Sequence, residues 1–336
     1  MKHSTRINIL SCILLSLALT SLNACATAKP SAAPSKAYTG FVDMMVNKHQ
    51  FDRASLDELL GKAKLQPRIL KAMSSPAEKR LEWHSYRKIF LKPNRIKGGI
   101  KFWKDNKALL TAASEKYGVP TEIIVAIIGV ETRYGGNTGS FKVLDSLTTL
   151  GFHFPKRAKF FTSELKHFLL LCREEGFDPL KPKGSYAGAM GQSQFISSSY
   201  RAYAVDGDAD NKRDLWDSHA DIIHSVANYF AKHGWKRGEA IAQLVNVTGS
   251  SYQSLINTKL KPKHTLQDLS KQRVPVPVDM PSSTPVKLLQ LKQKNNKEHW
   301  LAFHNFYVIT RYNHSSLYAM AAFQLSQEIK KGMQSS

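Results

Sequence analysis

A single carboxylate ends the most apolar segment of the sequence. Residues 123–130 carry no polar side chain, Glu131 follows them, and Gly135 and Gly136 come shortly after. An apolar surface all round predicts a helix buried on every side. Burial and the negative end of the helix dipole both disfavour a charged carboxylate, so we expect a raised pKa for Glu131 and the chemistry of a general acid. The alternative is a structural carboxylate paired with Arg133 at the surface.

The segment 185–195 combines small residues with polar and aromatic ones. Its sequence is Ser-Tyr-Ala-Gly-Ala-Met-Gly-Gln-Ser-Gln-Phe. Small residues let backbones approach closely, while Ser185, Gln194 and Phe195 offer hydrogen-bonding groups and an apolar face. This mixture suits a sugar, which has hydroxyls at its edge and apolar C–H faces. A tight turn that only packs helices together would have the same composition.

An acidic loop follows at residues 206–217. The spacing of its oxygen ligands matches a calcium loop of EF-hand type, in which position 7 contributes a backbone carbonyl. Two positions differ, since Asn211 replaces the usual glycine and the twelfth residue has the shorter carboxylate. We expect a structural calcium ion here, and the alternative is an acidic, solvated turn. The predicted ligands are Asp206, Asp208, Asp210, Lys212, Asp214 and Asp217.

The first residues predict export and a lipid anchor. Lys2 and Arg6 precede an apolar stretch at 7–20, which is too short to span a bilayer. The run Leu-Asn-Ala-Cys that ends at Cys25 resembles a bacterial lipobox, and Ala26 after it indicates the outer membrane of a Gram-negative cell. We therefore expect a signal peptide at 1–24, lipidation of Cys25 and a flexible tether at 25–36.

The charge of the chain is strongly positive. With 48 Lys and Arg against 26 Asp and Glu, the net charge is +22, which predicts attraction to an anionic partner. Export excludes nucleic acid as that partner and leaves cell wall or lipid. Of the three cysteines, only Cys172 would remain as a free thiol after processing, so no intramolecular disulfide is expected. No His-x-x-x-His pair or His/Cys cluster predicts a zinc site.

The elements that must position these groups are mainly helical. Helical spacing predicts helices over 102–117, 155–175 and 315–331, and the apolar run predicts the one that ends near Glu131. Short β-prone segments follow at 242–247, 286–291 and 300–308. We expect a mainly α (α+β) protein: a helical region and core at 37–240, a small β-containing region at 241–312, and a helix at 313–336 that returns to the core.

Taken together, these residues resemble the lytic murein transglycosylase B family. The matching stretches occur in the family's order and span the mature chain: 130–136, 149–158, 185–191 with Gln194 and Phe195, 204–216, 225–230 and 305–313. The resemblance implies a lysozyme-like catalytic core with an additional helical region, a small β region and a calcium site. It also implies a lipid-anchored enzyme on the periplasmic face of the outer membrane, which acts on peptidoglycan glycan strands as a monomer without a catalytic cofactor.

The resemblance also assigns site residues. It places the catalytic acid on Glu131. It also implies that the sugar is contacted by Tyr86, Arg157, Ser185, Met190, Gln194, Phe195, Tyr229, Tyr307 and Tyr312. The sequence departs from the family at Gln192 and Ser193, and at Ile196 and Ser197, where other members have different residues around the Gln-Phe pair.

The implied reaction needs only one carboxylate. Glu131 would protonate the oxygen that links N-acetylmuramic acid to N-acetylglucosamine, and would then take the proton of the C6 hydroxyl as that oxygen attacks C1 and closes a 1,6-anhydro ring. Glycosidases that use water usually pair two carboxylates. Two alternatives stay open: a lysozyme-type hydrolase with water as the nucleophile, and a non-catalytic lipoprotein that binds peptidoglycan.

Overall fold

The computed structural model describes residues 35–74, 81–256 and 259–335. The predicted signal peptide, Cys25 and almost all of the tether lie outside these residues, and their assignments stay predictions. In the part that is described, no helix combines the length and the apolar character that crossing a membrane requires.

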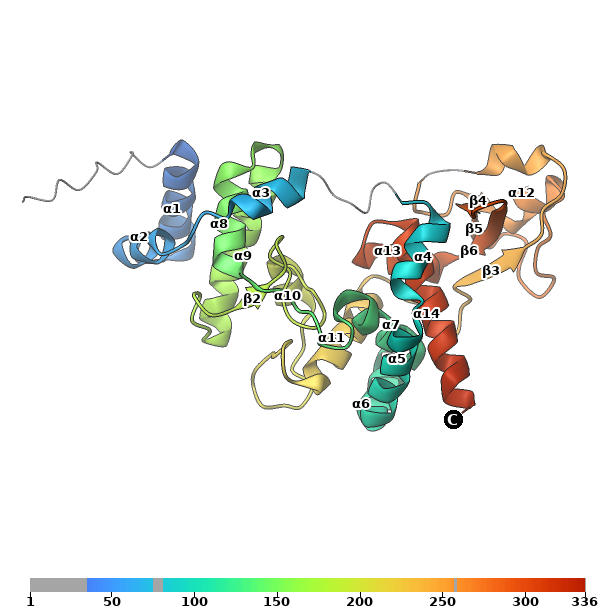
Figure 1. Cartoon of the computed structure of the whole chain (residues 1–336), viewed down its shortest axis with the longest axis horizontal. Coiled ribbons are helices and arrows are strands. Elements are labelled where there is room, and N and C mark those ends of the chain that lie inside the picture. Colours follow the sequence, from blue (N-terminus) through green and yellow to red (C-terminus); the bar gives the residue numbers. More distant parts are fainter. Residues whose placement is uncertain (1–34, 75–80, 257–258, 336) are drawn as a thin grey trace, which may run out of the picture.

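Helices dominate the fold, and Figure 1 shows them in two groups with a small sheet beyond the second. In the first group α8 and α9 pack along each other, α3 packs on α8, and α1 contacts α2. Its helices are α1 (Lys36–His49), α2 (Arg53–Gly61), α3 (Pro67–Ser74), α8 (Val143–His153) and α9 (Ala158–Glu175). A two-stranded ladder of β1 (Phe141–Lys142) and β2 (Lys183–Gly184) lies at its edge.

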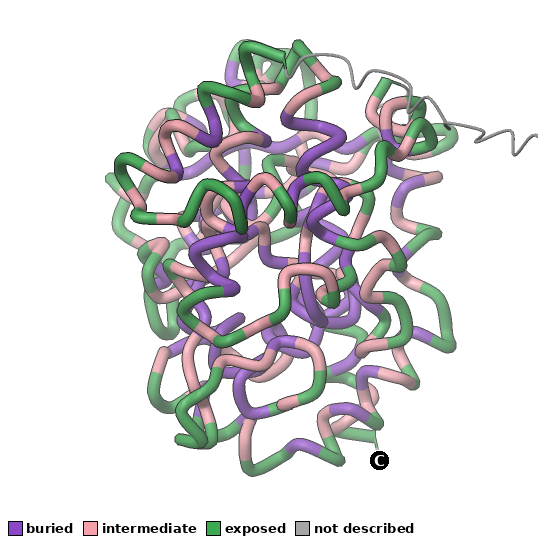
Figure 2. The backbone as a smooth tube through the Cα atoms, turned by 90° about the vertical axis from the view of Figure 1, so that its left-hand side faces the viewer, coloured by how far each residue is buried: buried purple, intermediate pink, exposed green. Residues whose placement is uncertain are grey.

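The second group surrounds α7 (Thr121–Thr132). The C-terminal helix α14 (Ser316–Gln334) packs against α7, α5 and α4, and α11 packs against α6 and α7. Figure 2 shows buried residues gathered toward the interior of the molecule and exposed ones around its outside. The other members are α4 (Trp83–Phe90), α5 (Pro93–Asp105), α6 (Lys107–Tyr117), α11 (His219–Lys232) and α13 (His304–Tyr312). Helix α10 (Ser197–Tyr203) packs against α9 of the first group and against α11.

The predicted burial of α7 is confirmed. Every residue from Ile123 to Val130 is buried, as the apolar run requires. Gly129 allows the ring of Tyr134 to lie directly on the helix, because a Cβ at this position would come 2.3 Å from the Tyr134 hydroxyl oxygen. Gly98 and Gly99 on α5 make room for the same ring. The ring therefore sits between α5 and α7 and fixes the end of α7.

The small sheet contains four antiparallel strands in the order β3-β6-β5-β4. Val286 and Leu288 on one face of β5 join a small core within this region, whereas Leu289 and Leu291 on the other face join the main core. This alternation attaches the sheet to the helices. Its elements are β3 (Ala242–Val245), β4 (His264–Thr265), β5 (Pro285–Lys292) and β6 (Lys297–Ala302), with the turn η3 (Ser251–Leu255) and α12 (Leu266–Lys271) between them.

Three expected elements differ from the structure. The helix expected over 102–117 is two helices, because Asn106 leaves the helical conformation and its side-chain amide donates to the Phe102 carbonyl at 2.9 Å. The β-prone segment 300–308 is strand only to Ala302, and its apolar residues continue as the buried face of α13. The helix expected from Pro155 begins with the short turn η2 (Pro155–Arg157) before α9.

Candidate active site

Glu131 lies in the last turn of α7, at the end of the buried helix. The hydroxyl of Tyr318 donates a hydrogen bond to Glu131 Oε1 at 2.5 Å, and Tyr318 is itself buried on α14. Glu131 itself is half-buried. A hydrogen bond of this kind favours the charged form of a carboxylate. The sequence predicted the position of Glu131 but not its partner. The available signal was a tyrosine on the buried side of the last helix.

Two tyrosine hydroxyls stay protonated beside this carboxylate. Burial raises the pKa of Tyr318 well above 10, and the negative charge of Glu131 raises it further. The pKa of Tyr312 is raised in the same way, first by burial and then by the charge of Glu131. The proximity of Tyr86 adds to the raised pKa of Tyr318. The structure therefore brings two of the predicted sugar contacts, Tyr312 and Tyr86, to the surroundings of the predicted acid.

The chain turns sharply where α7 ends, one residue after Glu131. Arg133 and Tyr134 have φ of 55° and 60°, in the left-handed region that ends a helix. Thr132 Oγ1 accepts a hydrogen bond from the Gly135 amide at 3.1 Å and lies 3.1 Å from the Gln192 carbonyl oxygen, to which it can donate. The end of α7 is thus tied to the segment 185–195.

That segment is a compact double turn. The Ser185 and Ala189 backbones are joined by a hydrogen bond of 2.8 Å, and Ser185 Oγ accepts from the Ala189 amide at 3.0 Å. Met190 and Phe195 are paired as an antiparallel bridge. Gln194 has φ 50° and donates from Nε2 to the carbonyls of Thr138 and Gly191, each at 3.0 Å. Both interpretations of this segment are compatible with such a turn, because tight packing also presents its polar groups.

An aromatic cluster connects the turn to α11 and α13. The Phe195 ring lies 5.5 Å from that of Tyr229 and 5.8 Å from that of Tyr312, measured between centroids. The Tyr229 and Tyr312 rings lie 4.7 Å apart. Tyr312 donates to the Ser193 carbonyl at 2.6 Å and Tyr229 to the Arg311 carbonyl at 2.6 Å. These three predicted residues form one rigid group that includes a tyrosine next to Glu131.

Two predicted contacts lie apart from this group. Tyr307 lines a different cavity, of about 570 Å³, together with Phe303 and His304 at the start of α13. Arg157 is exposed, and its guanidinium carbon stacks over the ring of Phe160 at 4.2 Å, at the start of α9. Their roles toward a sugar stay predictions.

The residues that depart from the family pattern are buried beside the site. Gln192, Ser193 and Ser197 are each less than a tenth exposed. Gln192 Oε1, Ser193 Oγ and Ser197 Oγ have no hydrogen-bond partner within the described ranges. Buried polar atoms of this kind are usually satisfied by ordered water. The sequence change therefore adds polarity behind the segment 185–195.

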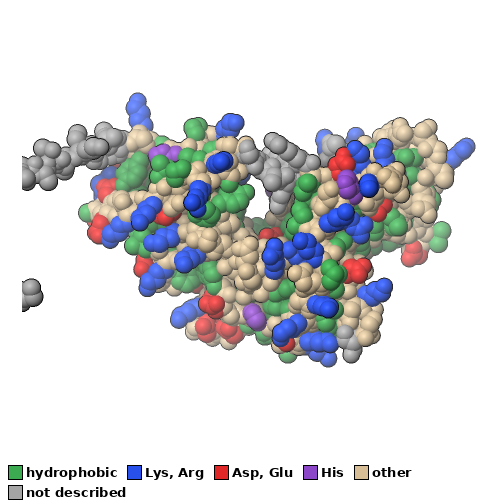
Figure 3. Space-filling view, viewed as in Figure 1, with side chains coloured by type: hydrophobic (Ala, Val, Ile, Leu, Met, Phe, Trp, Pro, Cys, Tyr) green, Lys and Arg blue, Asp and Glu red, His purple; other side chains and the backbone are tan. Residues whose placement is uncertain are grey.

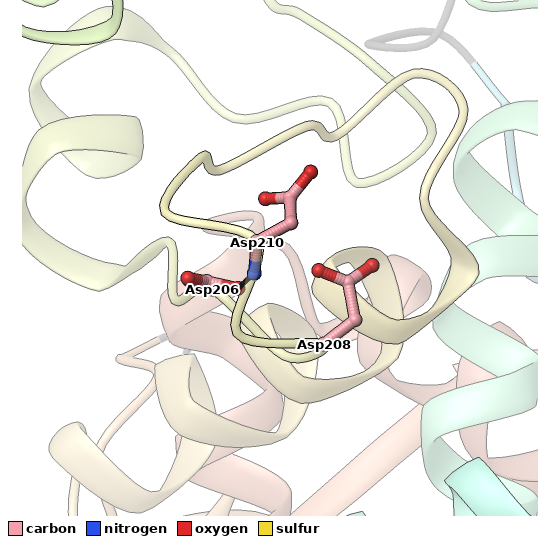
Figure 4. Close-up of side chains that lie close together, drawn as sticks. All are labelled: Asp206, Asp208 and Asp210. Carbon is pink, nitrogen blue, oxygen red and sulfur yellow. Dashed lines mark hydrogen bonds between the residues drawn. The ribbon is translucent and has the colours of Figure 1, made fainter.

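The acidic loop brings part of its predicted ligand set together. Carboxylate oxygens of Asp206, Asp208 and Asp210 lie within 4.8 Å of one another, and Figure 4 shows their side chains on the same turn. Asn211, at position 6, has φ 68°, the left-handed conformation that this position requires. Asp214 instead accepts from the amides of Trp216 and Asp217 within its own turn. Clustered hard oxygen ligands fit a calcium ion.

A residue outside the predicted set holds this loop. Asp221, buried on α11, accepts from the Gly207 and Asp214 amides at 2.6 Å each and so joins both ends of the loop. Burial raises the pKa of Asp221, and the charges of Asp208 and Asp206 raise it further. Gly207 is needed here, since a Cβ would come 2.6 Å from the Ala220 backbone. Without a cation in the loop, its negative charges therefore disfavour the charged form of Asp221.

Cys172 is a structural thiol. It is the one free cysteine among the described residues, it is buried on α9, and burial raises the pKa of its thiol to about 12. A thiol that keeps its proton in this way is not a nucleophile near neutral pH.

Comparisons with known proteins agree with this geometry. The Transglycosylase SLT domain matches residues 34–327. The chain is 42% identical over 298 residues to the membrane-bound lytic murein transglycosylase B of Escherichia coli (strain K12), which covers 86% of this chain and 81% of that protein. These relatives are lytic transglycosylases, which are enzymes that act on peptidoglycan.

Solved structures give the same result. Catenated SltB1 of Pseudomonas aeruginosa superposes with a TM-score of 0.86 at 42% identity, covering 89% of this chain and 99% of that one. Escherichia coli Slt35 in complex with calcium gives 0.81 at 41%, covering 89% and 94%. Pseudomonas aeruginosa SltB3 in complex with NAG-NAM-pentapeptide gives 0.79 at 29%, covering 88% and 79%.

These matches confirm the mainly α, lysozyme-like fold expected from the sequence, and they confirm the resemblance to the family. A peptidoglycan-degrading transglycosylase fits both the chemistry expected of Glu131 and the surroundings that the structure gives it. By sequence, by domain and by structure, the chain belongs to the lytic murein transglycosylase B family.

Proposed function

We propose that this chain cleaves the β-1,4 bond between N-acetylmuramic acid and N-acetylglucosamine without water, with Glu131 as its only general acid and base. The products would carry 1,6-anhydromuramyl ends. The observation that carries the proposal is a carboxylate at the end of a buried helix, 2.5 Å from the hydroxyl of Tyr318 and next to a cluster of aromatic rings. Aromatic rings and protonated tyrosines are suitable walls for a sugar site.

The three buried Asp and Glu residues of the described chain have structural roles. Asp145 accepts from the Lys64 amide and the Gln66 side chain, each at 3.0 Å, and thereby joins α8 to the segment before α3. Glu164 accepts from the Ser198 amide at 2.9 Å, at the start of α10. Asp221 holds the acidic loop. This division of tasks favours a mechanism with one acid over one with a carboxylate pair.

In the proposed reaction one carboxyl group first donates a proton and then accepts a different one. Glu131 donates its proton to the glycosidic oxygen as the bond to C1 breaks, and the muramyl acetamido group stabilises the positive charge at C1. The Glu131 carboxylate then accepts the proton of the C6 hydroxyl while the C6 oxygen bonds to C1. Tyr318 donates to Oε1 throughout, because its raised pKa keeps its proton in place. The carboxylate is thus stabilised when it forms.

We assign the surrounding residues to the glycan. Tyr86 and Tyr312 lie close to the acid, Phe195 and Tyr229 extend the aromatic wall, and the turn at 185–195 offers Ser185, Met190 and Gln194. Arg157 and Tyr307 would contact more distant parts of the substrate.

The acidic loop would hold a structural calcium ion. Asp206, Asp208 and Asp210 would be its first ligands, with the Lys212 carbonyl, Asp214 and Asp217 completing the set after the loop closes. The bound ion would neutralise the loop and thereby stabilise α11, which carries Tyr229. It takes no part in the proton transfers.

The lipobox supports a lipid on Cys25 and a place on the periplasmic side of the outer membrane. With the Cys25→Ser variant expressed in a Gram-negative host, we expect the protein to move from the membrane fraction to the soluble fraction. Retention in the membrane fraction would contradict the anchor.

The Glu131→Gln variant tests the chemistry. We expect the release of muropeptides from purified peptidoglycan to fall by at least about 100-fold, the usual contribution of a general acid, with the circular dichroism spectrum unchanged. Glu122→Gln is the matched control, because it makes the same change at the other end of α7, where Glu122 pairs with Lys330.

Mass spectrometry of the wild-type digest distinguishes the alternatives. Anhydromuramyl ends are lighter by one water than reducing ends. Products with only reducing ends would instead support the hydrolase, and a digest without any products would support the non-catalytic lipoprotein.

A further inference from the structure

Three positively charged side chains surround a small cavity beside the end of α7. Lys92, Arg95 and Arg133 line it together with Asn94, Gly98 and Tyr134, and its volume is about 180 Å³. Arg133 follows Glu131 by two residues. The cavity therefore lies against the segment that carries the predicted acid, but none of its residues belongs to the predicted sugar contacts.

Arg95 is an unusual residue to find in this place. It is only 8% exposed, and its Nη1 has no hydrogen-bond partner among the residues that the structure describes. The guanidinium lies over the ring of Phe90 at 5.1 Å. Burial lowers the pKa of Arg95, and the nearby charge of Arg133 lowers it further. A buried cation next to another cation is unfavourable unless an anion joins them.

The ion pairs seen among the described residues leave these three cations out. None of the ion pairs within the described ranges includes Lys92, Arg95 or Arg133. The cavity also lies at the start of α5, where Lys92 is the N-cap, no side chain caps the first amides and the first turn has no acidic residue. The positive end of the helix dipole adds to the field of the three cations. Figure 3 shows Lys and Arg side chains gathered over this middle part of the molecule, where Figure 1 places α5 and α7.

The walls of the cavity are rigid. The Tyr134 hydroxyl donates to the Arg95 carbonyl at 3.0 Å, and its ring stacks on Phe102 with 5.6 Å between centroids. A Cβ on Gly98 would come 3.0 Å from this ring. A preformed, electropositive cavity with an unpartnered, buried guanidinium is suited to a carboxylate, which Arg can bind through two parallel hydrogen bonds.

We propose that this cavity is an anion subsite that binds a carboxylate of the peptide carried by the muramyl residue of the substrate. The inference rests on the proposed function, since peptidoglycan is the polymer whose sugar residues carry such peptides. The volume suits a carboxylate with a few water molecules, each of which needs about 30 Å³. Glycan that carries peptides would then bind better than glycan whose peptide carboxylates are neutralised.

Binding of a disaccharide tests the subsite without cleavage. The probe is N-acetylglucosaminyl-N-acetylmuramyl-pentapeptide, which lacks the bond to be cut, and its partner is the same molecule with the peptide carboxylates amidated. By isothermal titration calorimetry we expect the wild type to bind the charged probe about tenfold more tightly, which corresponds to about 1.4 kcal/mol. The Arg133→Gln variant should lose most of this preference, and Arg133→Lys should keep part of it.

Lys97→Gln is the matched control, because Lys97 is an exposed cation on α5 that does not line the cavity. Equal affinity of the wild type for both probes would overturn the subsite, as would an equal loss in Lys97→Gln and Arg133→Gln. A loss of affinity for both probes in Arg133→Gln would assign Arg133 to the fold or the sugar site instead. The proposed function fails separately, if digests of peptidoglycan lack anhydromuramyl ends while the binding preference persists.

Discussion

The Tyr318→Phe variant examines how the protein controls its predicted acid. The substitution removes one oxygen atom from a side chain that is only 3% exposed and leaves the ring in place. It deletes the hydrogen bond of 2.5 Å to Glu131 Oε1. Because α14 packs along α7 through many other buried residues, such as Met320 and Leu325, we expect the fold to persist.

The magnitude follows from the charge that develops on Glu131. A hydrogen bond to a charged group contributes roughly 1.5–3 kcal/mol, and it is strongest after the carboxyl group has given its proton to the leaving oxygen. The loss therefore falls on the transition state and lowers kcat by about 10- to 100-fold, with a smaller change in KM. The carboxylate also loses a stabilising contact, so the alkaline limb of the pH–rate profile should move to higher pH.

The assay is the initial rate of anhydromuramyl release between about pH 4 and pH 9. Tyr200→Phe is the control, because Tyr200 is equally buried and its hydroxyl donates to the Arg213 carbonyl, close to the acidic loop and not to Glu131. If Tyr318→Phe kept kcat within about threefold of the wild type with an unmoved pH profile, Tyr318 would not position the acid. A purely structural role would lower the melting temperature without shifting the alkaline limb.

Two further outcomes concern stability. Chelation of calcium should lower the melting temperature by roughly 5–8 °C, since an ion at about 100 times its dissociation constant contributes about 2.7 kcal/mol. The Asp208→Asn variant should respond less to the chelator, and an identical transition with and without chelator in the wild type would refute the site. Lys287, only 2% exposed on β5, has its pKa lowered by burial from 10.5 to about 8. The unfolded chain binds this proton more tightly, so stability should rise as the pH increases from about 8 to 10.5, by up to about 3 kcal/mol. The free energy of unfolding can be measured with urea at pH 7 and pH 10. At pH 7 we expect Lys287→Met to be more stable than the wild type, and its stability to depend less on pH. A less stable variant at pH 7 would show that the hydrogen bonds of Lys287 to the Lys259 carbonyl and to Ser316 outweigh the cost of its burial.

The sequence was most informative where one local pattern determines the structure. An unbroken apolar run predicts a buried helix, and α7 is buried along this run and ends one residue after Glu131. The regular spacing of aspartates likewise predicts a loop, and three of them meet. The same reasoning failed at 102–117, where helical spacing continues across Asn106 although the chain bends there. Periodicity does not report a change of helix axis.

Such local patterns could not predict contacts between segments that are distant in the sequence. Tyr318 meets Glu131 across 187 positions, and nothing in the local sequence of either residue names the other. Tyr307 and Tyr312 both stand in the stretch that resembles the family, yet five residues of helix turn them to different surroundings. The cavity at Arg95 is a similar case, because Lys92 directly precedes α5 and Arg133 directly follows α7. Dispersed charges in a sequence can therefore form a local cluster.

The order of elements along the chain explains why the predicted acid depends on the whole fold. Glu131 ends α7, whereas Tyr318 follows the strands β3 to β6 and α13 along the chain, so the pair forms only when α14 is packed back against α7. The sheet contributes directly to this return, because Leu289 and Leu291 on β5 pack into the main core, and Lys287 donates to Ser316 at the start of α14. A carboxylate without its tyrosine would lack the contact that stabilises its charged form. An incompletely folded chain would then carry the acid but only a small part of its activity, which is a useful property for an enzyme that cuts the wall of the cell that makes it.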